Sequence, residues 1–215
     1  MSANLQDISK LRQQTGAGML DCKKAIDEAA GNFDKAVEIL RKKGVAKAAK
    51  RSEKVAAEGL VHSYIHAGGK IGVLVEVNCE TDFVAKNESF KDLVNDVAMH
   101  IAASAPLYVS KEEVPAELID KEKDVYREQM KNEGKPEDII EKIIDGKIEK
   151  YYSEICLLEQ SFIKDEDKTI SEMLVEKTGE IGEKITIRRF SRYELGEGLE
   201  KKSCDFAEEV AEQLN

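Results

Sequence analysis

The side chains that could carry covalent chemistry in this 215-residue chain are few and scattered. Its four cysteines stand far apart, and none forms a Cys-x-x-Cys pair: Cys22, Cys79, Cys156 and Cys204. A thiol nucleophile needs a base beside it, and no local motif supplies one, so a thiol hydrolase is the weakest hypothesis. We expect free thiols, with neither a disulfide framework nor a zinc site.

Histidines and glycines give no better case for an enzyme. His62 and His66 lie in a segment that alternates like a strand, where residues four apart are ~13 Å apart, too far to share one metal ion. The chain lacks the motifs GxxxxGK[ST] and GxGxxG, which hold nucleotide phosphates, and it lacks HExxH. We therefore expect no catalytic residue, no metal and no cofactor.

One short segment near the start combines apolar and charged residues as a binding surface would. In LRQQTGAGMLDCKKAI (11–26), Gly16 and Gly18 make a turn that Met19 and Leu20 follow. A three-helix bundle can bury such residues in its core or expose them beside flanking cations. Physical grounds alone favour burial by about two to one.

A second segment, VNCETDFVAKNESF (77–90), follows a predicted strand. Its polar residues lead into Phe83 and Val84. A phenylalanine in such a loop is either a hydrophobic staple for the next helix or a projecting anchor for a partner. The residues alone favour neither interpretation.

Charge divides the chain into a basic head and an acidic body. The formal net charge is −10, but residues 1–51 carry +5 and residues 52–215 carry −15. This balance disfavours nucleic acid as the direct ligand, because such binding needs clustered Lys and Arg. No apolar run approaches the ~20 residues of a membrane span, and the first residues lack a signal peptide's apolar core. We expect a cytoplasmic protein that does not bind membranes.

Helical spacing divides the head into three short helices. Residues 1–44 are expected to form this three-helix, partner-docking domain, with Gly44 just past the last helix, and residues 45–57 a basic linker. The apolar stripes comprise Leu5, Ile8, Leu11, Met19, Cys22, Ile26, Phe33, Val37 and Leu40.

Residues 58–215 are expected to form an α+β core, which is also the candidate dimerisation domain. Runs at 59–66 and 71–78 flank a Gly-Gly turn and predict a β-hairpin. A third strand is predicted at 184–193, with a bulge near Arg188-Arg189.

Helices are expected to pack on this small antiparallel sheet. Apolar stripes predict a helix at 89–104 and a last helix that holds Phe206, Val210 and Leu214. The highly charged stretch 111–152 breaks at Gly134-Lys135-Pro136, which predicts a helical hairpin over about 115–152.

Together the segments resemble the bacterial elongation factor Ts family. The similar stretches follow the family's order along nearly the whole chain: LRQQTGAGMLDCKKAI, EVNCETDFVAKNESF, IAASAP, GKPEDIIEKIIDGKIEKYYSEICLLEQSFIKDEDKTI and YELGEGLEKKSCDFAEEVAEQL. The resemblance implies a translation elongation factor that acts as a guanine-nucleotide exchange factor for elongation factor Tu. It would promote GDP release by disturbing the partner's magnesium and phosphate site.

The resemblance also implies where the partner is contacted. The head looks like a ubiquitin-associated-type domain, and the helical hairpin resembles the family's coiled coil. The implied contacts are Arg12, Met19, Leu20 and Lys23 in the head, Thr81, Asp82, Phe83 and Val84 in the segment credited with dislodging magnesium, and Ile71, Gly72 and His100 in a second patch.

The chain departs from the long members of that family, which have two sheet-bearing halves. It has one HAGGKIGVLV-type hairpin before a single TDFV, as in short members, which pair as homodimers. In such a pair, the contacts of Ile71-Gly72 and of Asp82-Phe83 with the partner come either from one subunit or from two. The alternative function is an acidic helical adaptor or chaperone-like binding protein without exchange activity.

Overall fold

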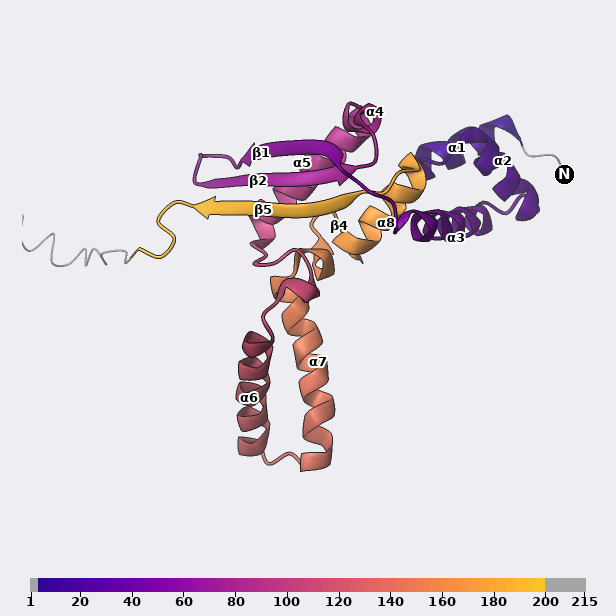
Figure 1. Ribbon diagram of the computed structural model, residues 1–215. Coiled ribbons are helices and arrows are strands. Elements are labelled where there is room, and N and C mark those ends of the chain that lie inside the picture. The colour runs from indigo at the N-terminus through magenta and orange to yellow at the C-terminus, as the bar shows by residue number, and fades with distance from the viewer. Residues whose placement is uncertain (1–3, 200–215) are drawn as a thin grey trace, which may run out of the picture.

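The structure, a computed structural model, describes residues 4–199 except for the side chain of Asp138. Figure 1 shows a helical head, a sheet with helices against it, and a helical hairpin that projects away from both. The predicted α+β class is confirmed. The predicted last helix, with Phe206, Val210 and Leu214, lies outside the described residues.

The head consists of α1 (Leu5–Thr15), α2 (Met19–Glu28) and α3 (Phe33–Arg51). The side chains of Asn4 and Asn32 cap α1 and α3 by accepting backbone N–H groups. The small core of this bundle contains Ile8, Leu11, Cys22, Ala25, Ile26, Ala36 and Leu40.

The prediction that the third helix ends at Gly44 is wrong, since α3 continues to Arg51. The residues after Gly44 are mainly alanine and lysine, which favour helix. Tertiary packing also overrides the glycine, because α3 crosses α8 (Ile170–Ile181) where Gly44 meets Gly179. Much of the expected linker is therefore helical and joins the head directly to the body.

Three antiparallel strands form the sheet in the order β1-β2-β5: β1 (Glu58–Ile65), β2 (Ile71–Cys79) and β5 (Thr186–Glu194). Glu76 lies opposite Arg189 and Val77 opposite Ile187, so Arg188 is the extra residue of a bulge. The predicted bulge is confirmed.

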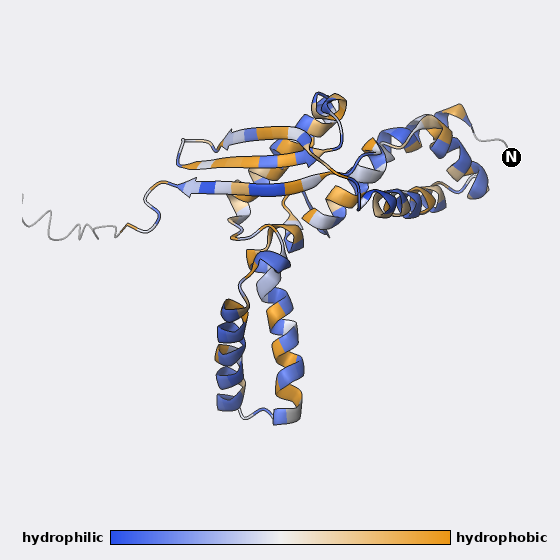
Figure 2. Cartoon of the chain, viewed as in Figure 1, coloured by the Kyte–Doolittle hydropathy of each residue, from blue (hydrophilic) through white to orange (hydrophobic). Residues whose placement is uncertain are grey.

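One face of the sheet is packed and the other is not. Val73, Val75 and Val77 point into the main core, which α5 (Glu88–Ser104) covers together with α8 and a small hairpin of β3 (Ser161–Phe162) and β4 (Asp165–Thr169). On the opposite face, within residues 4–199, the apolar side chains of Val61, Ile65, Leu74 and Tyr193 are exposed. Figure 2 shows the apolar stretches along β1 and β2.

The predicted helical hairpin is confirmed as α6 (Ala116–Asn132) and α7 (Glu137–Ile155). It has a core of its own, formed by Ile119, Met130, Ile140, Ile144 and Ile148. Short 3₁₀ turns at Lys111–Glu113 and Leu157–Glu159 lie where the hairpin joins the body. Among the described helices, none combines the length and apolar character needed to span a bilayer.

Candidate partner-binding surface

Phe83 projects from a single helical turn, α4 (Asp82–Ala85), just beyond the end of β2. Its side chain is 80% exposed, whereas Val84 packs partly against the main core. A hydrophobic staple would be packed against its helix. The geometry therefore favours the projecting anchor over the staple.

Asp82 lies beside Phe83 and is also exposed. Its carboxylate is 2.7 Å from the Lys86 ammonium one turn later. This hydrogen bond lowers the pKa of Asp82, so the group is a carboxylate at neutral pH. Asp82 thus offers a negative charge directly next to an apolar projection.

The backbone before α4 is held by a carboxylate from the other end of the sequence. Glu183 accepts hydrogen bonds from the Thr81 hydroxyl at 2.7 Å, the Thr81 amide at 3.0 Å and the Glu80 amide at 3.1 Å. In return, the Glu80 carboxylate accepts from the Lys184 amide at 2.7 Å. We call this four-bond arrangement of Glu80, Thr81, Glu183 and Lys184 the carboxylate clasp.

The clasp also connects to the head. The second oxygen of Glu80 accepts from Arg51, the last residue of α3, at 2.8 Å. The Lys184 ammonium donates to the carbonyl of Ser52 at 2.6 Å. The end of the head, the Phe83 turn and the connection from α8 to β5 therefore meet at one place.

Met19 and Leu20 begin α2 and are 45% and 68% exposed. The prediction that both side chains are buried in the bundle is wrong, because Leu11, Cys22 and Ile26 already fill its core. Arg12 and Lys23 are also exposed, so the head displays both its apolar and its basic candidates.

The second patch lies at the other end of β2 from Phe83. Ile71 and Gly72 begin this strand and are half-buried. Arg192, which pairs with Val73, donates to the carbonyl of Ala102 near the end of α5. The end of α5 that carries His100 therefore lies under the same part of the sheet.

The direct partner contact expected for His100 is revised, because the side chain of His100 is fully buried and presents no surface to a partner. The Ile163 amide can only donate, so Nδ1 accepts from it at 3.4 Å and Nε2–H donates to Gln160 Oε1 at 3.0 Å. Burial lowers the pKa of His100. A neutral imidazole here joins α5 to the Gln160 segment, and any effect on a partner passes through its neighbours.

Covalent and metal chemistry gain no support within residues 4–199. Cys22, Cys79 and Cys156 are buried free thiols. Burial raises their pKa values, that of Cys156 to about 11, which is opposite to the activation of a nucleophile. No cluster of three His, Cys, Asp or Glu side chains that could hold a metal ion occurs in this part of the chain. Cys204 lies outside it.

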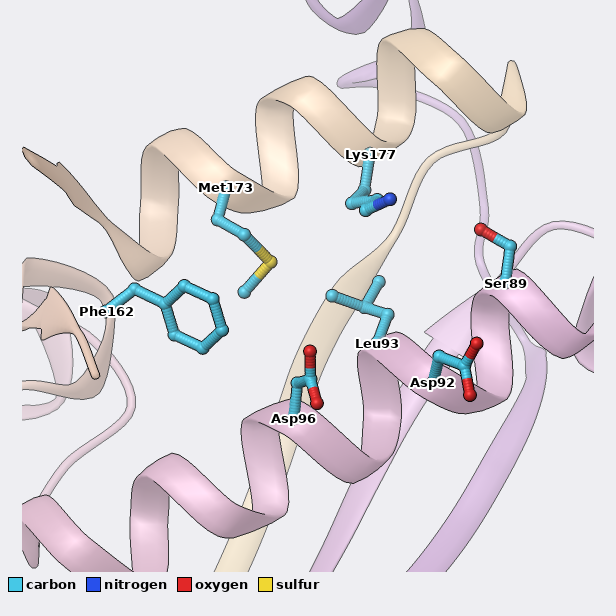
Figure 3. A pocket seen from close by; sticks show the side chains of 7 residues that line it. All are labelled: Ser89, Asp92, Leu93, Asp96, Phe162, Met173 and Lys177. Atoms are coloured by element: carbon cyan, nitrogen blue, oxygen red, sulfur yellow. The ribbon is translucent and has the colours of Figure 1, made fainter. Parts of the chain in front are cut away.

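Two hollows lie beside α8. The smaller hollow, of about 250 Å³, lies between α5 and α8, and Asp96, Phe162 and Met173 are among the residues that line it (Figure 3). The Asp96 carboxylate is already paired with the Lys164 ammonium at 2.7 Å.

The larger hollow, of about 760 Å³, runs between the head and α8. Its charges include the ion pairs Asp21–Lys47, Glu176–Lys168 and Glu180–Lys177. Neither lining places a nucleophile beside a base.

Glu183 carries no local signal in the sequence, although the segment 77–90 contains its partner Glu80. The two lie 103 positions apart, and no local periodicity relates them. Only the return of β5 beside β2 brings the connection after α8 to the Phe83 turn.

The chain is similar to known proteins over nearly its whole length. The family model described as "Elongation factor TS" matches residues 2–197. The protein named elongation factor Ts from Alkaliphilus oremlandii is 62% identical over 207 residues, which cover 96% of this chain and 95% of that protein. The protein of the same name from Acetivibrio thermocellus is 60% identical over 208 residues, 97% of each chain. That from Geobacter sulfurreducens is 59% identical over 211 residues, 98% of each.

Proposed function

Because the chain belongs to the elongation factor Ts family, we propose that it promotes the release of GDP from elongation factor Tu in the cytoplasm. Such a factor catalyses nucleotide exchange on its partner and makes or breaks no covalent bond. The observation that carries the proposal is Phe83, an exposed aromatic side chain on a turn that the carboxylate clasp holds in place.

Phe83 supplies binding energy that depends on the state of the partner. Burial of one phenylalanine is worth ~1.5–3 kcal/mol, which is roughly a ten- to hundred-fold effect. This energy promotes exchange only if the receiving pocket is better formed in the nucleotide-free partner than in the loaded one. Linkage then requires that GDP weaken the binding of the factor by the same ratio.

Asp82 places a carboxylate next to the entering ring. Near the partner's magnesium site, this charge would compete with groups or waters that support the metal. Its Lys86 partner is exposed, so the ion pair costs little to break. We assign Thr81 and Val84 to holding the turn and Asp82 and Phe83 to disturbing the magnesium and phosphate site.

The head and the second patch supply the remaining affinity in this proposal. Arg12, Met19, Leu20 and Lys23 form an exposed apolar and basic surface suited to docking. Ile71 and Gly72 make a second contact at the opposite end of β2. Contacts this far apart let the chain hold the partner while Phe83 acts on one site.

The test is a stopped-flow measurement of fluorescent GDP release from elongation factor Tu with excess unlabelled GDP. We expect release to accelerate with factor concentration and then to saturate. A titration calorimetry experiment on the same proteins separates the alternative. Binding without any acceleration of release would support the adaptor and overturn the exchange function.

We also propose that two copies pair through the uncovered face of the sheet. Val61, Ile65, Leu74 and Tyr193 form an exposed apolar area on this face, beside the ion pairs of Glu76 with Arg188 and Arg189, and such an area is stabilised by being covered. Light scattering should then give twice the 24.0 kDa chain mass, and Leu74→Lys should return the monomer mass. A monomer mass for the unaltered protein would contradict the pairing.

A further inference from the structure

We propose that Glu183 is a positioning residue for nucleotide exchange: it holds the turn at Thr81–Val84 so that Phe83 projects toward the partner. This inference rests on the exchange function proposed above and adds a residue that does not itself contact the partner. The carboxylate clasp carries the argument.

The turn needs support from outside itself. α4 contains four residues, which is a single turn, and helices this short are not stable by their own hydrogen bonds. Its N-cap bond, from the Val84 amide to the Thr81 hydroxyl, is 3.5 Å long. Val84 and Ala85 pack the far side of the turn against the main core, so the direction in which Phe83 points depends on how Thr81 fixes the near side.

Glu183 fixes Thr81 through both backbone and side chain. One carboxylate oxygen accepts from the Glu80 and Thr81 amides, and the other accepts from the Thr81 hydroxyl. Because this hydroxyl donates to Glu183, its lone pairs are left to accept from Val84. One charged group thus orients the entry to the turn and the cap of the turn together.

Glu183 is itself held in position. α8 ends at Gly182 in the left-handed conformation, with φ 86°, and Glu183 follows directly. The next amide, that of Lys184, donates to Glu80. The carboxylate therefore acts from the end of a packed helix, and bonds in both directions join it to the turn.

A positioning role and a merely stabilising role predict different kinetics. If Glu183 orients Phe83, its loss lowers the maximal rate of GDP release, while the head and second patch preserve most of the affinity. If it only stabilises the fold, the folded fraction of the variant retains the full maximal rate. The saturation curve of the stopped-flow experiment separates rate from affinity.

We would compare Glu183→Ala and Glu183→Gln with the control Glu176→Gln, which removes a partly exposed carboxylate of α8 paired with Lys168 at 2.8 Å. We expect Glu183→Ala to lower the maximal release rate about ten-fold, with a half-saturating concentration within about two-fold of the original. Glu183→Gln should be intermediate, because its carbonyl still accepts from the two amides but its NH₂ cannot accept from Thr81. Glu176→Gln should be unchanged.

A double-mutant cycle with Phe83→Ala gives the decisive comparison. If Glu183 acts through Phe83, Glu183→Ala should cause little further loss once the ring is gone. Additive losses would overturn the proposal, as would a Glu183→Ala protein that releases GDP at the original maximal rate. If the alanine variant does not fold, the same cycle with Glu183→Gln decides.

Hydrogen exchange on the free chain separates this inference from the function on which it rests. The Glu80 and Thr81 amides should exchange faster in Glu183→Ala than in the unaltered protein, and amides of the core strand β2 should not. Unchanged exchange at both amides would overturn the clasp. An unaltered protein that fails to accelerate GDP release would instead overturn the exchange function.

Discussion

Gly44 of α3 and Gly179 of α8 meet backbone to backbone where the head packs on the body. The contact is asymmetric. A Cβ on Gly179 would stand 2.7 Å from Gly44 Cα and 3.0 Å from Gly44 O, whereas a Cβ on Gly44 would stand 3.9 Å from Gly179 Cα. The same substitution on the two helices should therefore have opposite effects.

We expect Gly179→Ala to lower the free energy of unfolding by about 1–3 kcal/mol, because the added methyl group must push α3 away. Gly44→Ala fits in the space present and should raise the free energy of unfolding by about 0.5–1 kcal/mol through helix propensity. Urea unfolding of both variants checks the pair. Equal effects of the two substitutions would contradict the described crossing.

Phe83→Ala should slow stimulated GDP release by about ten- to hundred-fold and leave stability nearly unchanged. The reason is that the ring is exposed in the free chain, and in the complex that we propose it is buried against the partner. The measurement is stopped-flow GDP release at saturating factor. Leu107→Ala, which truncates another exposed apolar side chain, is the matched control and should release GDP normally. An equally fast, folded Phe83→Ala protein would refute the anchor.

Leu20→Ala should raise the half-saturating concentration about three- to ten-fold while the maximal rate stays close to the original. A docking residue that lies away from the Phe83 turn contributes affinity in every state of the partner, so it changes binding more than catalysis. Leu5→Ala in the same head is a suitable control, because Leu5 is also exposed but belongs to no proposed contact. If Leu20→Ala lowered only the maximal rate, the docking role would be wrong.

Stability should depend on pH through His100. Burial lowers its pKa in the folded protein below the usual value of about 6.5, so the unfolded chain takes up the proton first as pH falls. The free energy of unfolding should therefore be highest above that value and decrease below it. We expect a steeper loss from about pH 7.5 to about pH 5.5 for the original protein than for His100→Asn.

Urea titrations at the two pH values provide the measurement. The comparison is internal, because both proteins keep His62 and His66. Asparagine can still accept from Ile163 and donate to Gln160, so the variant retains polar partners for both. Equal slopes for the two proteins would show that His100 is not the group responsible.

The elements that could be predicted are those whose signals lie within short windows. The strands, the bulge at Arg188 and the helical hairpin all follow from local periodicity and turn residues. The TDFV segment could be singled out because a polar loop that carries an aromatic residue is itself a local pattern.

The features that were missed depend on contacts between distant parts of the chain. α3 continues past Gly44 because α8 lies against it. Met19 and Leu20 are exposed because other residues fill the bundle core first. Glu183 reaches Thr81 across 102 positions, and no spacing rule connects them. The resemblance places His100 in a partner patch, yet its side chain is buried and hydrogen-bonded to Gln160.

Among the side chains that the structure describes, the core of the helical hairpin shares none with the cluster beneath the sheet. Substitutions within α6 and α7 can therefore accumulate without repacking the residues that support the Phe83 turn. Helical turns can also be added or removed at the Gly134 end, because the buried residues of α7 recur every four positions, at Ile140, Ile144 and Ile148. The length of the helical hairpin can therefore change in evolution while the residues around the Phe83 turn stay the same.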